Sequence, residues 1–490
     1  MILRDLLKDV ETEKVQGGTD VEISDVQFDS RLVREGGLFI AVSGTQVDGH
    51  DFIWQCIEKG VRAVVCERMP EDMPQRESEV TFVVVRDARR AVAIIAANFY
   101  GHPSERLSLV GVTGTNGKTT TATLLWKIVR AMGHKAGLLS TVCNYVNEEP
   151  IPATQTTPDA LTLNALLAKM AEEGCEYCFM EVSSHAIAQE RTAGLVFRGG
   201  IFTNLTRDHL DYHKTFENYR DTKKLFFDGL PREAFAVTNK DDKNGMVMVQ
   251  NTRATVHTYA TRVLADYKAH IVEEGFEGML LSVNGKEVFV SLVGRFNVSN
   301  LLAVYGAALC LGFEADEVLT ALSAVSPVNG RFETIRSPKG WTAVIDYAHT
   351  PDAVENVINT INEILRANVV KSDKKRLITV IGCGGNRDTG KRPIMAQIAK
   401  KGSQVLILTS DNPRNEEPQA ILDDMLAGLT EEEKQDTLVI TDRRQAIRTA
   451  CTIAAQGDVI LVAGKGHENY QIINGVKHHF DDHEEVKAMV

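Results

Sequence analysis

The stretch from Gly114 to Thr120 has the sequence Gly-Thr-Asn-Gly-Lys-Thr-Thr, whose residue types suit the binding of nucleotide phosphates. Glycines allow backbone N–H groups to close on phosphate oxygens, and the start of a helix adds its partial positive charge. The Lys118 ammonium can reach the β- and γ-phosphates, and the Thr119 hydroxyl can bind Mg²⁺. The spacing departs from the common phosphate loop, because Val112 stands where that loop has its first glycine. The stretch predicts an ATP-using enzyme or a nucleotide-dependent switch.

Polar residues follow two further strand-like runs. Glu181 ends one run and His185 lies just beyond it, while His209 and His213 follow the next run. Open α/β sheets bind ligands at the ends of their buried strands, so we expect these side chains near the phosphate loop. A carboxylate such as Glu181 would complete a magnesium site with Thr119. For each histidine, a hydrogen-bonded place on the surface is the alternative.

The phosphate loop needs a strand before it and a helix after it, and the sequence supplies both. An apolar run at 107–113 precedes the loop, and a run with helical periodicity at 121–132 follows it. Such alternation along most of the chain is typical of α/β layers. Turn-forming residues at 100–104 and 326–331 indicate three domains, with limits 1–103, 104–330 and 331–490. We expect a small N-terminal α/β domain, a central parallel sheet with the phosphate loop, and a Rossmann-like C-terminal α/β domain.

Composition narrows the class of protein. The 490 residues include 66 acidic and 54 basic side chains, and the resulting charge of −12 argues against a nucleic-acid or anionic-membrane binder. No apolar run approaches the roughly 18–20 residues of a membrane span, and charges occupy the N-terminal segment where a signal peptide is apolar. The eight cysteines are scattered, and Cys175 with Cys178 lacks a second pair for zinc. We expect buried, reduced thiols in a soluble cytoplasmic protein.

Several motifs together resemble the Mur ligases, a family of peptidoglycan synthesis. They are TGTNGKTT (113–120), EVSSHA (181–186), NLTRDHLDYH (204–213), the helical segment with Tyr219 and Lys223, GRFNVSN (294–300), DYAHTPDA (346–353), GCGGNRDTGKRP (382–393), DNPRNEEP (411–418) and GKGHE (464–468). They occur in the family's order over nearly the whole chain. The resemblance is strongest to members that add the third residue of the peptide.

The resemblance implies a reaction through an acyl phosphate. ATP would phosphorylate the D-glutamate γ-carboxylate of UDP-N-acetylmuramoyl-L-Ala-D-Glu, and the amine of an amino acid would then displace phosphate to form an amide. Because carboxylate and phosphate repel each other, catalysis must rest on positioning and charge neutralisation. The family pattern gives that task to Lys118, Arg331 and two Mg²⁺ ions.

The family pattern also supplies ligands for the two ions. Thr119 and Glu181 would hold the first, and His209 with a carbamylated Lys223, carrying a CO₂-derived carbamate, would hold the second. The spacing from Tyr219 favours Lys223 over Lys224. From the residues alone, two solvated lysines on an amphipathic helix are the alternative.

The expected contacts to ATP extend beyond the phosphates. By resemblance, Asn297 and Asn300 contact adenine, and Asp346 and His349 lie near the ribose and phosphates. The phosphate-binding set is Gly114, Thr115, Asn116, Gly117, Lys118, Thr119 and Thr120. For either asparagine alone, a helix cap is the alternative.

The incoming amino acid is expected to bind mainly to the third domain. The resemblance implies the contact residues Arg387, Asp411, Asn412, Pro413, Arg414, Gly464 and Glu468. An arginine can form a forked pair with a carboxylate, and Asp411, Asn412 and Glu468 can accept from an ammonium. The resemblance links the DNPR form to meso-diaminopimelate as the substrate, with L-lysine as the alternative.

Contacts to the UDP-sugar are expected in the first two domains. Ser30 and the segment 38–50 resemble the family's uridine-binding segment, and Thr156, Thr157, Ser184 and Arg191 resemble contacts to the muramoyl-peptide and its phosphates. A surface ion pair is the alternative for Arg191. A folylpolyglutamate-type ligase would leave the uridine segment idle, and a silent nucleotide-binding regulator would not retain the metal-binding set. We expect a monomer.

Overall fold

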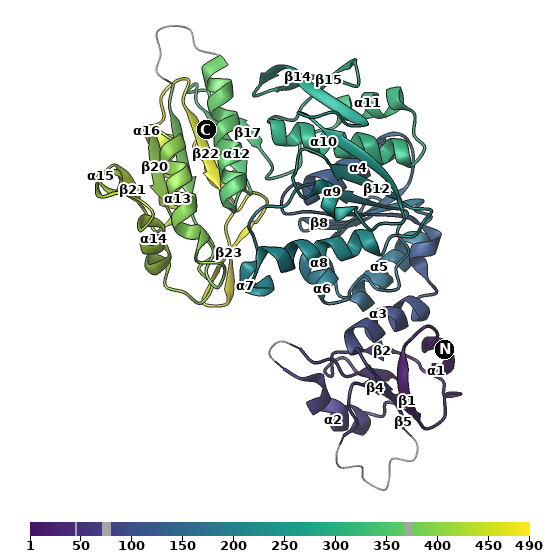
Figure 1. Cartoon of the computed structure of the whole chain (residues 1–490). Coiled ribbons are helices and arrows are strands. Elements are labelled where there is room, and N and C mark those ends of the chain that lie inside the picture. Colours follow the sequence, from purple (N-terminus) through teal and green to yellow (C-terminus); the bar gives the residue numbers. More distant parts are fainter. Residues whose placement is uncertain (45–46, 71–79, 368–374) are drawn as a thin grey trace.

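The computed structural model describes residues 1–44, 47–70, 80–367 and 375–490. Its strands form three large sheets that follow one another along the chain, and we name the regions that carry them the N-terminal, central and C-terminal parts. In Figure 1 the purple N-terminal part lies below the teal central part, and the green and yellow C-terminal part lies beside it. The predicted α/β fold with three sheet-bearing parts is confirmed. Among the described residues, no helix has the length and apolar character needed to cross a membrane.

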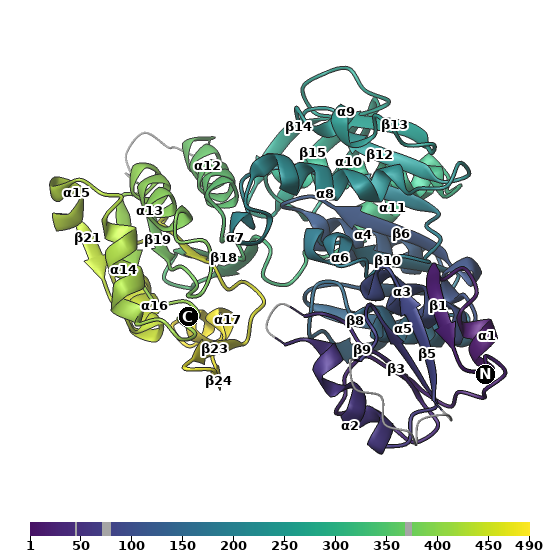
Figure 2. The same cartoon turned by 60° about the horizontal axis from the view of Figure 1, so that its bottom comes forward.

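The N-terminal part has a five-stranded sheet in the order β1-β5-β4-β3-β2, in which only β1 is antiparallel to its neighbour. Its elements are α1 (Leu3–Leu6), β1 (Thr12–Gln16), β2 (Val26–Gln27), β3 (Leu38–Ile40), η1 (Gly49–Phe52), α2 (Ile53–Glu58), β4 (Ala63–Cys66), β5 (Thr81–Val85) and α3 (Ala88–Phe99). The Asp87 side chain caps α3 by accepting from two backbone N–H groups. Helix α3 lies between this sheet and the central part, as Figure 2 shows.

The central part has an eleven-stranded sheet in the order β16-β15-β14-β13-β12-β11-β6-β10-β7-β8-β9. Its elements are η2 (Pro103–Arg106), β6 (Ser108–Thr113), α4 (Lys118–Ala131), β7 (Ala136–Leu139), β8 (Cys143–Val146), β9 (Glu149–Pro152), α5 (Ala160–Glu172), β10 (Tyr177–Glu181), α6 (Ser184–Ala188), β11 (Gly199–Phe202), α7 (Leu210–His213), α8 (Phe216–Asp228), β12 (Phe235–Asn239), α9 (Gly245–Met248), β13 (Thr255–Ala260), β14 (Tyr267–Gly275), β15 (Gly278–Val283), β16 (Lys286–Val290), α10 (Arg295–Cys310) and α11 (Ala315–Ala324).

The predicted parallel sheet forms the middle of this sheet, from β7 through β10, β6, β11, β12 and β13 to β14. β8, β9, β15 and β16 extend it at both ends as antiparallel strands. The turn between β15 and β16 is Asn284-Gly285, and both residues have positive φ, 46° and 85°. Two consecutive left-handed residues match the twist of a tight hairpin, which joins antiparallel strands. The Asn-Gly pair was the sequence signal for this hairpin.

Helices cover both faces of the central sheet. Val110 and Val112 of β6 pack with α4, α10 and α11, while Leu109 of the same strand packs with α5 and α8. This alternation follows from the two-residue period of a strand. Burial on both faces explains why residues 109–112 of β6 carry no polar side chain.

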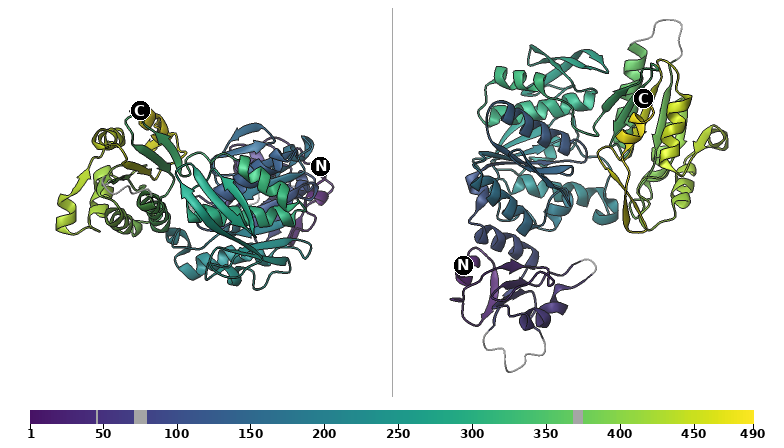
Figure 3. Two further views of the ribbon diagram at one scale, coloured as in Figure 1. Left: turned by 90° about the horizontal axis from the view of Figure 1, so that it is seen from above. Right: turned by 180° about the vertical axis from the view of Figure 1, so that it is seen from behind.

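The C-terminal part has a six-stranded sheet in the order β17-β18-β22-β19-β20-β21, parallel except for β17. Its elements are β17 (Glu333–Arg336), β18 (Thr342–Asp346), α12 (Pro351–Ala367), β19 (Leu377–Ile381), α13 (Lys391–Gly402), β20 (Val405–Leu408), α14 (Pro418–Leu426), α15 (Glu431–Gln435), β21 (Thr437–Val439), α16 (Arg443–Ile453), β22 (Val459–Ala463), the hairpin strands β23 (Tyr470–Ile473) and β24 (Val476–His479), and α17 (Asp482–Lys487). Figure 3 shows helices on both faces of the sheet, as in a Rossmann-like layer.

A buried ion pair fixes the end of the chain to the C-terminal part. Arg443 of α16 donates to both carboxylate oxygens of Asp482 in α17, each at 2.7 Å, and both side chains are fully buried. A third guanidinium bond goes to the Ala463 carbonyl at the end of β22. The pair therefore joins the last helix to the edge of the sheet that carries the site described below.

All eight cysteines are free thiols. Six are buried as expected, but Cys143 and Cys310 are half-buried, so the expectation of burial was wrong for these two. Cys175 and Cys178 both lie in the core under the central sheet, on and just before β10. Burial raises the pKa of the Cys175 thiol and that of the Cys178 thiol, which keeps them protonated.

Candidate active site

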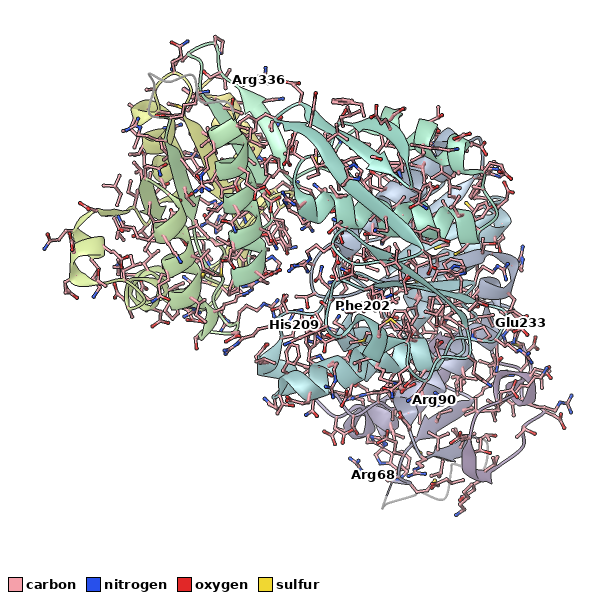
Figure 4. All side chains as sticks on the ribbon, turned by 45° about the horizontal axis from the view of Figure 1, so that its top comes forward. Arg68, Arg90, Phe202, His209, Glu233 and Arg336 are labelled. Carbon is pink, nitrogen blue, oxygen red and sulfur yellow. The ribbon has the colours of Figure 1, made fainter. Side chains whose placement is uncertain are left out.

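A cavity of about 630 Å³ lies between the central and C-terminal parts, where the carboxyl ends of both parallel sheets face each other. Loops after β6, β10 and β11 line one side, and loops after β18, β19, β20 and β22 line the other. Figure 4 shows His209 on the side of the central part that faces the C-terminal part. The predicted residues that line the cavity are Thr115, Asn116, Gly117, Lys118, Thr119, Thr156, Thr157, Glu181, Ser184, Arg191, His209, Lys223, Arg331, His349, Arg387, Asp411, Asn412, Arg414, Gly464 and Glu468.

The phosphate loop is held against the loop that follows β11. Gly114 has φ of 149°, and a Cβ at this position would lie 1.9 Å from Thr203 Oγ1, so only glycine fits. Thr203 Oγ1 donates to the Asn116 carbonyl at 2.6 Å, and the Asn116 N–H donates to Asn204 Oδ1 at 2.9 Å. Gly117 takes the left-handed conformation from which α4 begins. These contacts direct the loop toward the start of the helix, where an anion binds most favourably.

Lys118 folds back over this loop. Its Nζ donates to the carbonyls of Gly114 and Thr115 at 2.9 and 2.8 Å. Burial lowers the pKa of Lys118, against the opposing charges of Glu181 and Asp208. A phosphate at the loop would supply the counter-charge that this buried ammonium needs.

Lys223 of α8 lies behind the loop and is 1% exposed. Its Nζ donates to the Gly114 carbonyl at 2.8 Å and lies 4.9 Å from the centre of the Tyr219 ring. Burial and the neighbouring Lys118 ammonium lower the pKa of Lys223 well below its ordinary value. Lys224, the alternative in register, instead pairs with Asp228 at 2.6 Å.

Glu181 is almost completely buried at the end of β10. Its Oε1 accepts from Thr119 Oγ1 at 2.9 Å, from the Thr141 N–H at 2.8 Å and from Thr141 Oγ1 at 3.0 Å. The predicted pair of Thr119 and Glu181 is thus in direct contact. Oxygen atoms of this kind are the ligands that Mg²⁺ prefers.

His209 begins α7 with a left-handed φ of 54°. Its Nε2 lies 3.4 Å from Asp208 Oδ2, a carboxylate that also lines the cavity. Burial opposes ionisation of Asp208, but His209, Lys391 and His349 together lower its pKa to about 2. Among the described residues, no three His, Cys, Asp or Glu side chains converge to hold a metal by themselves.

The predicted muramoyl-peptide contacts form the wall next to Glu181. Thr157 Oγ1 donates to the Glu181 carbonyl at 2.8 Å, and Thr141 Oγ1 donates to Thr156 Oγ1 at 3.1 Å. Arg191 donates to the Thr157 carbonyl at 2.6 Å, which aims it into the cavity rather than at a surface carboxylate.

Ser184 pairs with a buried histidine, since His213 Nε2 lies 2.9 Å from Ser184 Oγ. Burial lowers the pKa of His213 to about 4, with help from the nearby His185 and Lys223. His213 is buried, whereas His185 and His209 are half-buried. The centre of the His185 ring lies 4.9 Å from that of His209 and 5.7 Å from that of His213.

The C-terminal wall carries both signs of charge. Arg414 has φ of 54°, and its Nη1 donates to the Gly385 carbonyl at 2.8 Å. Burial and the neighbouring Arg387 lower the pKa of Arg414. Asp411 and Glu468 lie on the same wall and oppose this effect. The wall therefore suits a ligand with a carboxylate and an ammonium.

Three contacts between the central and C-terminal parts involve residues that line the cavity. Arg331 Nη2 donates to Thr119 Oγ1 at 3.2 Å, and Asn116 Nδ2 donates to Asp352 Oδ2 at 3.1 Å. Arg207 lies 3.9 Å from Asp388. The first two join the phosphate loop directly to the C-terminal part, as the expected role of Arg331 requires.

Seven predicted residues do not line the cavity: Ser30, Gly114, Thr120, Asn297, Asn300, Asp346 and Pro413. Asn300 Oδ1 lies behind Gly117, and Asn300 Nδ2 donates to Asn297 Oδ1 at 3.2 Å. Asp346 accepts from the N–H groups of Phe332 and Ala348, both at 2.7 Å, and so shapes the connection after Arg331. The expected contacts of Asn297, Asn300 and Asp346 with ATP stay predictions.

Ser30 lies in the N-terminal part, away from this cavity, and its carbonyl accepts from Lys59 at 2.6 Å. Within the predicted uridine segment, residues 45 and 46 are outside the described residues. The Asp48 carboxylate binds the His50 ring and Arg68. The predicted uridine contact is not tested by these observations.

Sequence reasoning missed Thr141, Asp208, Tyr347 and Lys391, all of which line the cavity. Thr141 follows β7, so its place after a buried strand was the available signal. Asp208 precedes His209 within a motif that had already been singled out. Tyr347 stacks under Arg331, with its ring centre 4.6 Å from the guanidinium carbon.

Comparisons with known proteins place this architecture in a family. Three family models match successive stretches of the chain. They are described as "Mur ligase family, catalytic domain" (residues 22–100), "Mur ligase middle domain" (residues 112–308) and "Mur ligase, glutamate ligase domain" (residues 330–466). A protein of Phocaeicola vulgatus named UDP-N-acetylmuramoyl-L-alanyl-D-glutamate--2,6-diaminopimelate ligase is 60% identical over 99% of this chain and 98% of its own length. The chain is a Mur ligase. The resemblance inferred from the motifs is confirmed.

Two further comparisons place this Mur ligase more closely. A protein of the same name from Bacteroides thetaiotaomicron is 58% identical over the full length of both chains. A solved structure titled as that ligase shares 31% identity, covers 100% of this chain and 98% of its own, and superposes with a TM-score of 0.68. These relatives match this Mur ligase along all three parts, including the N-terminal one.

Proposed function

We propose that the chain is an ATP-dependent amide ligase that adds meso-diaminopimelate to the D-glutamate of UDP-N-acetylmuramoyl-L-Ala-D-Glu. One observation carries the proposal: a single cavity joins the phosphate loop to a wall bearing Arg387, Arg414, Asp411 and Glu468. The names of full-length relatives at 58–60% identity support it. ATP and the two other substrates are then the partners. The proposal includes a monomer that works in the cytoplasm.

The first step is phosphoryl transfer. An oxygen of the γ-carboxylate attacks the γ-phosphorus of ATP, the bond to the bridging oxygen breaks, and ADP leaves. Lys118 and Arg331 approach this point from opposite walls and offset the negative charge. The amine of the amino acid then attacks the acyl carbon, loses a proton, and phosphate departs as the amide forms.

The residues present fit Mg²⁺. Thr119 and Glu181 offer oxygen atoms for one ion, while His209 and Lys223 would hold a second. Mg²⁺ would take substrate phosphates and water for its remaining positions. When bound, the ions would offset charge on the transferring phosphoryl group.

Lys223 fits the expected carbamate. Its amine is buried with a strongly lowered pKa, so the neutral form is favoured, and only a neutral amine attacks CO₂. A nitrogen–carbon bond forms, one proton leaves, and the side chain becomes an anion. That change would turn a buried neutral amine beside Lys118 into an anionic metal ligand.

The amino-acid wall favours diaminopimelate over lysine. The distal end of diaminopimelate carries a carboxylate and an ammonium, whereas lysine has the ammonium alone. Arg387 and Arg414 would be left facing no carboxylate in a lysine complex, and unpaired charged groups cost affinity. Asp411, Asn412 and Glu468 would accept from the ammonium.

Phosphate release with ATP, Mg²⁺ and UDP-N-acetylmuramoyl-L-Ala-D-Glu tests the proposal, with meso-diaminopimelate and L-lysine compared in parallel. We expect turnover with diaminopimelate alone. Turnover with lysine would keep the reaction and reject the substrate. Absence of turnover with both would reject the ligase and favour another acceptor, such as a folate, or a regulator that binds ATP without turning it over.

A further inference from the structure

We propose that Lys465 is a positioning residue for the amino acid, and that it acts through Glu468 and Asn412. The inference rests on the proposed function, because it deepens the account of the amino-acid wall. The Lys465 side chain is 0% exposed, and its Nζ lies 3.0 Å from Glu468 Oε2 and 3.4 Å from Asn412 Oδ1. Lys465 is not among the residues that line the cavity, so it reaches the ligand only through these neighbours.

Charge is the first reason for this placement. Asp411 and Glu468 share one wall, and both must be ionised to bind an ammonium well. Burial and the neighbouring Asp411 raise the pKa of Glu468, whereas Lys465 opposes that rise. A buried ammonium at 3.0 Å therefore helps to keep the carboxylate charged where two acidic groups would otherwise favour a proton.

Orientation is the second reason. Asn412 Nδ2 donates to Glu468 Oε2 at 2.7 Å, and the Lys465 ammonium donates to the same oxygen. No described residue donates to Glu468 Oε1, which is left to accept from a ligand. Asn412 Oδ1 accepts from the Ile472 N–H at 2.9 Å as well as from Lys465, which fixes the direction of the amide.

The burial of Lys465 itself needs an explanation, because its side chain is 0% exposed. A lysine with no exposed surface is stabilised only when its charge is paired and hydrogen-bonded. Here its charged partner is a residue of the amino-acid wall, and its aromatic neighbour Tyr470 lies 5.5 Å away on β23. Lys465 therefore joins the hairpin β23–β24, the loop after β20 and the loop after β22 at one point.

The test compares Lys465→Met and Lys465→Arg with the wild-type chain in the phosphate-release assay. Lys477→Met is the matched control, because Lys477 faces the same Tyr470 ring at 4.4 Å but is exposed on β24. We expect Lys465→Met to raise the KM for meso-diaminopimelate about thirtyfold, the effect of leaving one member of a buried charge pair alone. The KM for ATP should stay within about twofold. Lys465→Arg should recover part of the loss.

Two further readouts separate positioning from general damage. In Lys465→Met, the KM for diaminopimelate should rise as pH falls over a range that begins at higher pH than in the wild type, because Glu468 takes up a proton more readily. In a Glu468→Gln background, the Lys465→Met change should add little, since the carboxylate through which it acts is gone. A purely structural role would give additive effects and an unshifted pH profile.

The outcomes are distinct. A wild-type chain that turns over diaminopimelate, with a Lys465→Met variant that matches Lys477→Met, would overturn the role of Lys465 and leave the proposed function intact. Equal rises in the KM values for ATP and diaminopimelate would also overturn it. A wild-type chain inactive with diaminopimelate and with L-lysine would overturn the proposed function and this role together. Turnover of L-lysine alone would reject only diaminopimelate as the substrate. The same variants would then be compared by their KM for L-lysine.

Discussion

Replacing Arg414 by alanine removes the guanidinium that the loop after β20 aims into the cavity. The backbone strain is unchanged, because alanine and arginine are both L-residues at the same φ of 54°. A hydrogen bond to a charged group contributes about 1.5–3 kcal/mol. Because the site is only half-buried and Arg387 remains beside it, we take about 2–3 kcal/mol for the loss of a forked pair. At about 1.4 kcal/mol per tenfold change, the KM for diaminopimelate should rise about 30- to 150-fold.

The assay is phosphate release at saturating ATP and UDP-N-acetylmuramoyl-L-Ala-D-Glu, with meso-diaminopimelate varied. Arg448→Ala, an exposed arginine on α16, is the control and should change nothing. Arg414→Lys should fall between wild type and Arg414→Ala, because lysine keeps the charge but not the fork. An unchanged KM for diaminopimelate would remove Arg414 from the amino-acid site. An equal rise in the KM for ATP would mean that the loop, not the contact, had been damaged.

Three other predictions concern Lys223, the buried pair of Arg443 and Asp482, and His467 in the loop after β22. Removing CO₂ should lower the rate of phosphate release, and bicarbonate should restore it at fixed pH and Mg²⁺. The Lys223→Arg variant should lose activity by at least about a hundredfold and gain nothing from bicarbonate. Equal activity with and without CO₂ would count against the carbamate. Asp482→Asn leaves the buried Arg443 charge unpaired and should lower the free energy of unfolding by about 3–5 kcal/mol. The measurement is urea unfolding followed by Trp341 fluorescence, in a chain whose other tryptophans are replaced by phenylalanine. A loss below about 1 kcal/mol would contradict this prediction. Burial and the nearby Arg331 lower the pKa of His467 to about 3, so the unfolded chain takes up the proton first as pH falls below about 6.5. Stability should therefore drop by about 2 kcal/mol between pH 7 and 5 from this group, and His467→Gln should show that much less dependence on pH.

Strands were predicted correctly where a single apolar run of the sequence marked them. The apolar run at 107–113 became β6, and the runs ending at Glu181 and before Asn204 became β10 and β11. The carboxyl ends of parallel strands meet at one edge of a sheet, which is why residues far apart in sequence could be placed together. The antiparallel strands at both ends of the central sheet were not predicted, although Asn284-Gly285 indicated a hairpin.

The roles of site residues were harder to predict where a polar side chain is hydrogen-bonded to backbone groups of the protein itself. Asp346 has the residue type and place of a ligand contact, yet its two oxygens cap the turn after Arg331 and the turn at Ala348. Asn297 donates to the Val293 carbonyl of its own helix start. Sequence alone shows that a polar residue is present, but which partner it satisfies depends on burial and on chain direction, which only the folded structure fixes.

The contacts of Arg331 with Thr119 and of Asn116 with Asp352 tie the phosphate loop to the C-terminal part. If ATP strengthens the approach of the two parts by some factor, then their approach strengthens ATP binding by the same factor, because the two equilibria share one thermodynamic cycle. Under the proposed function the amino-acid wall belongs to the C-terminal part, so an approach favoured by ATP would also bring the amine of the amino acid closer to the phosphate loop. In the proposed reaction the phosphoryl group stays in the cavity as the acyl phosphate until the amine attacks. Departure of phosphate as the amide forms would therefore remove a contact that favours the approach of the two parts, and would ease product release.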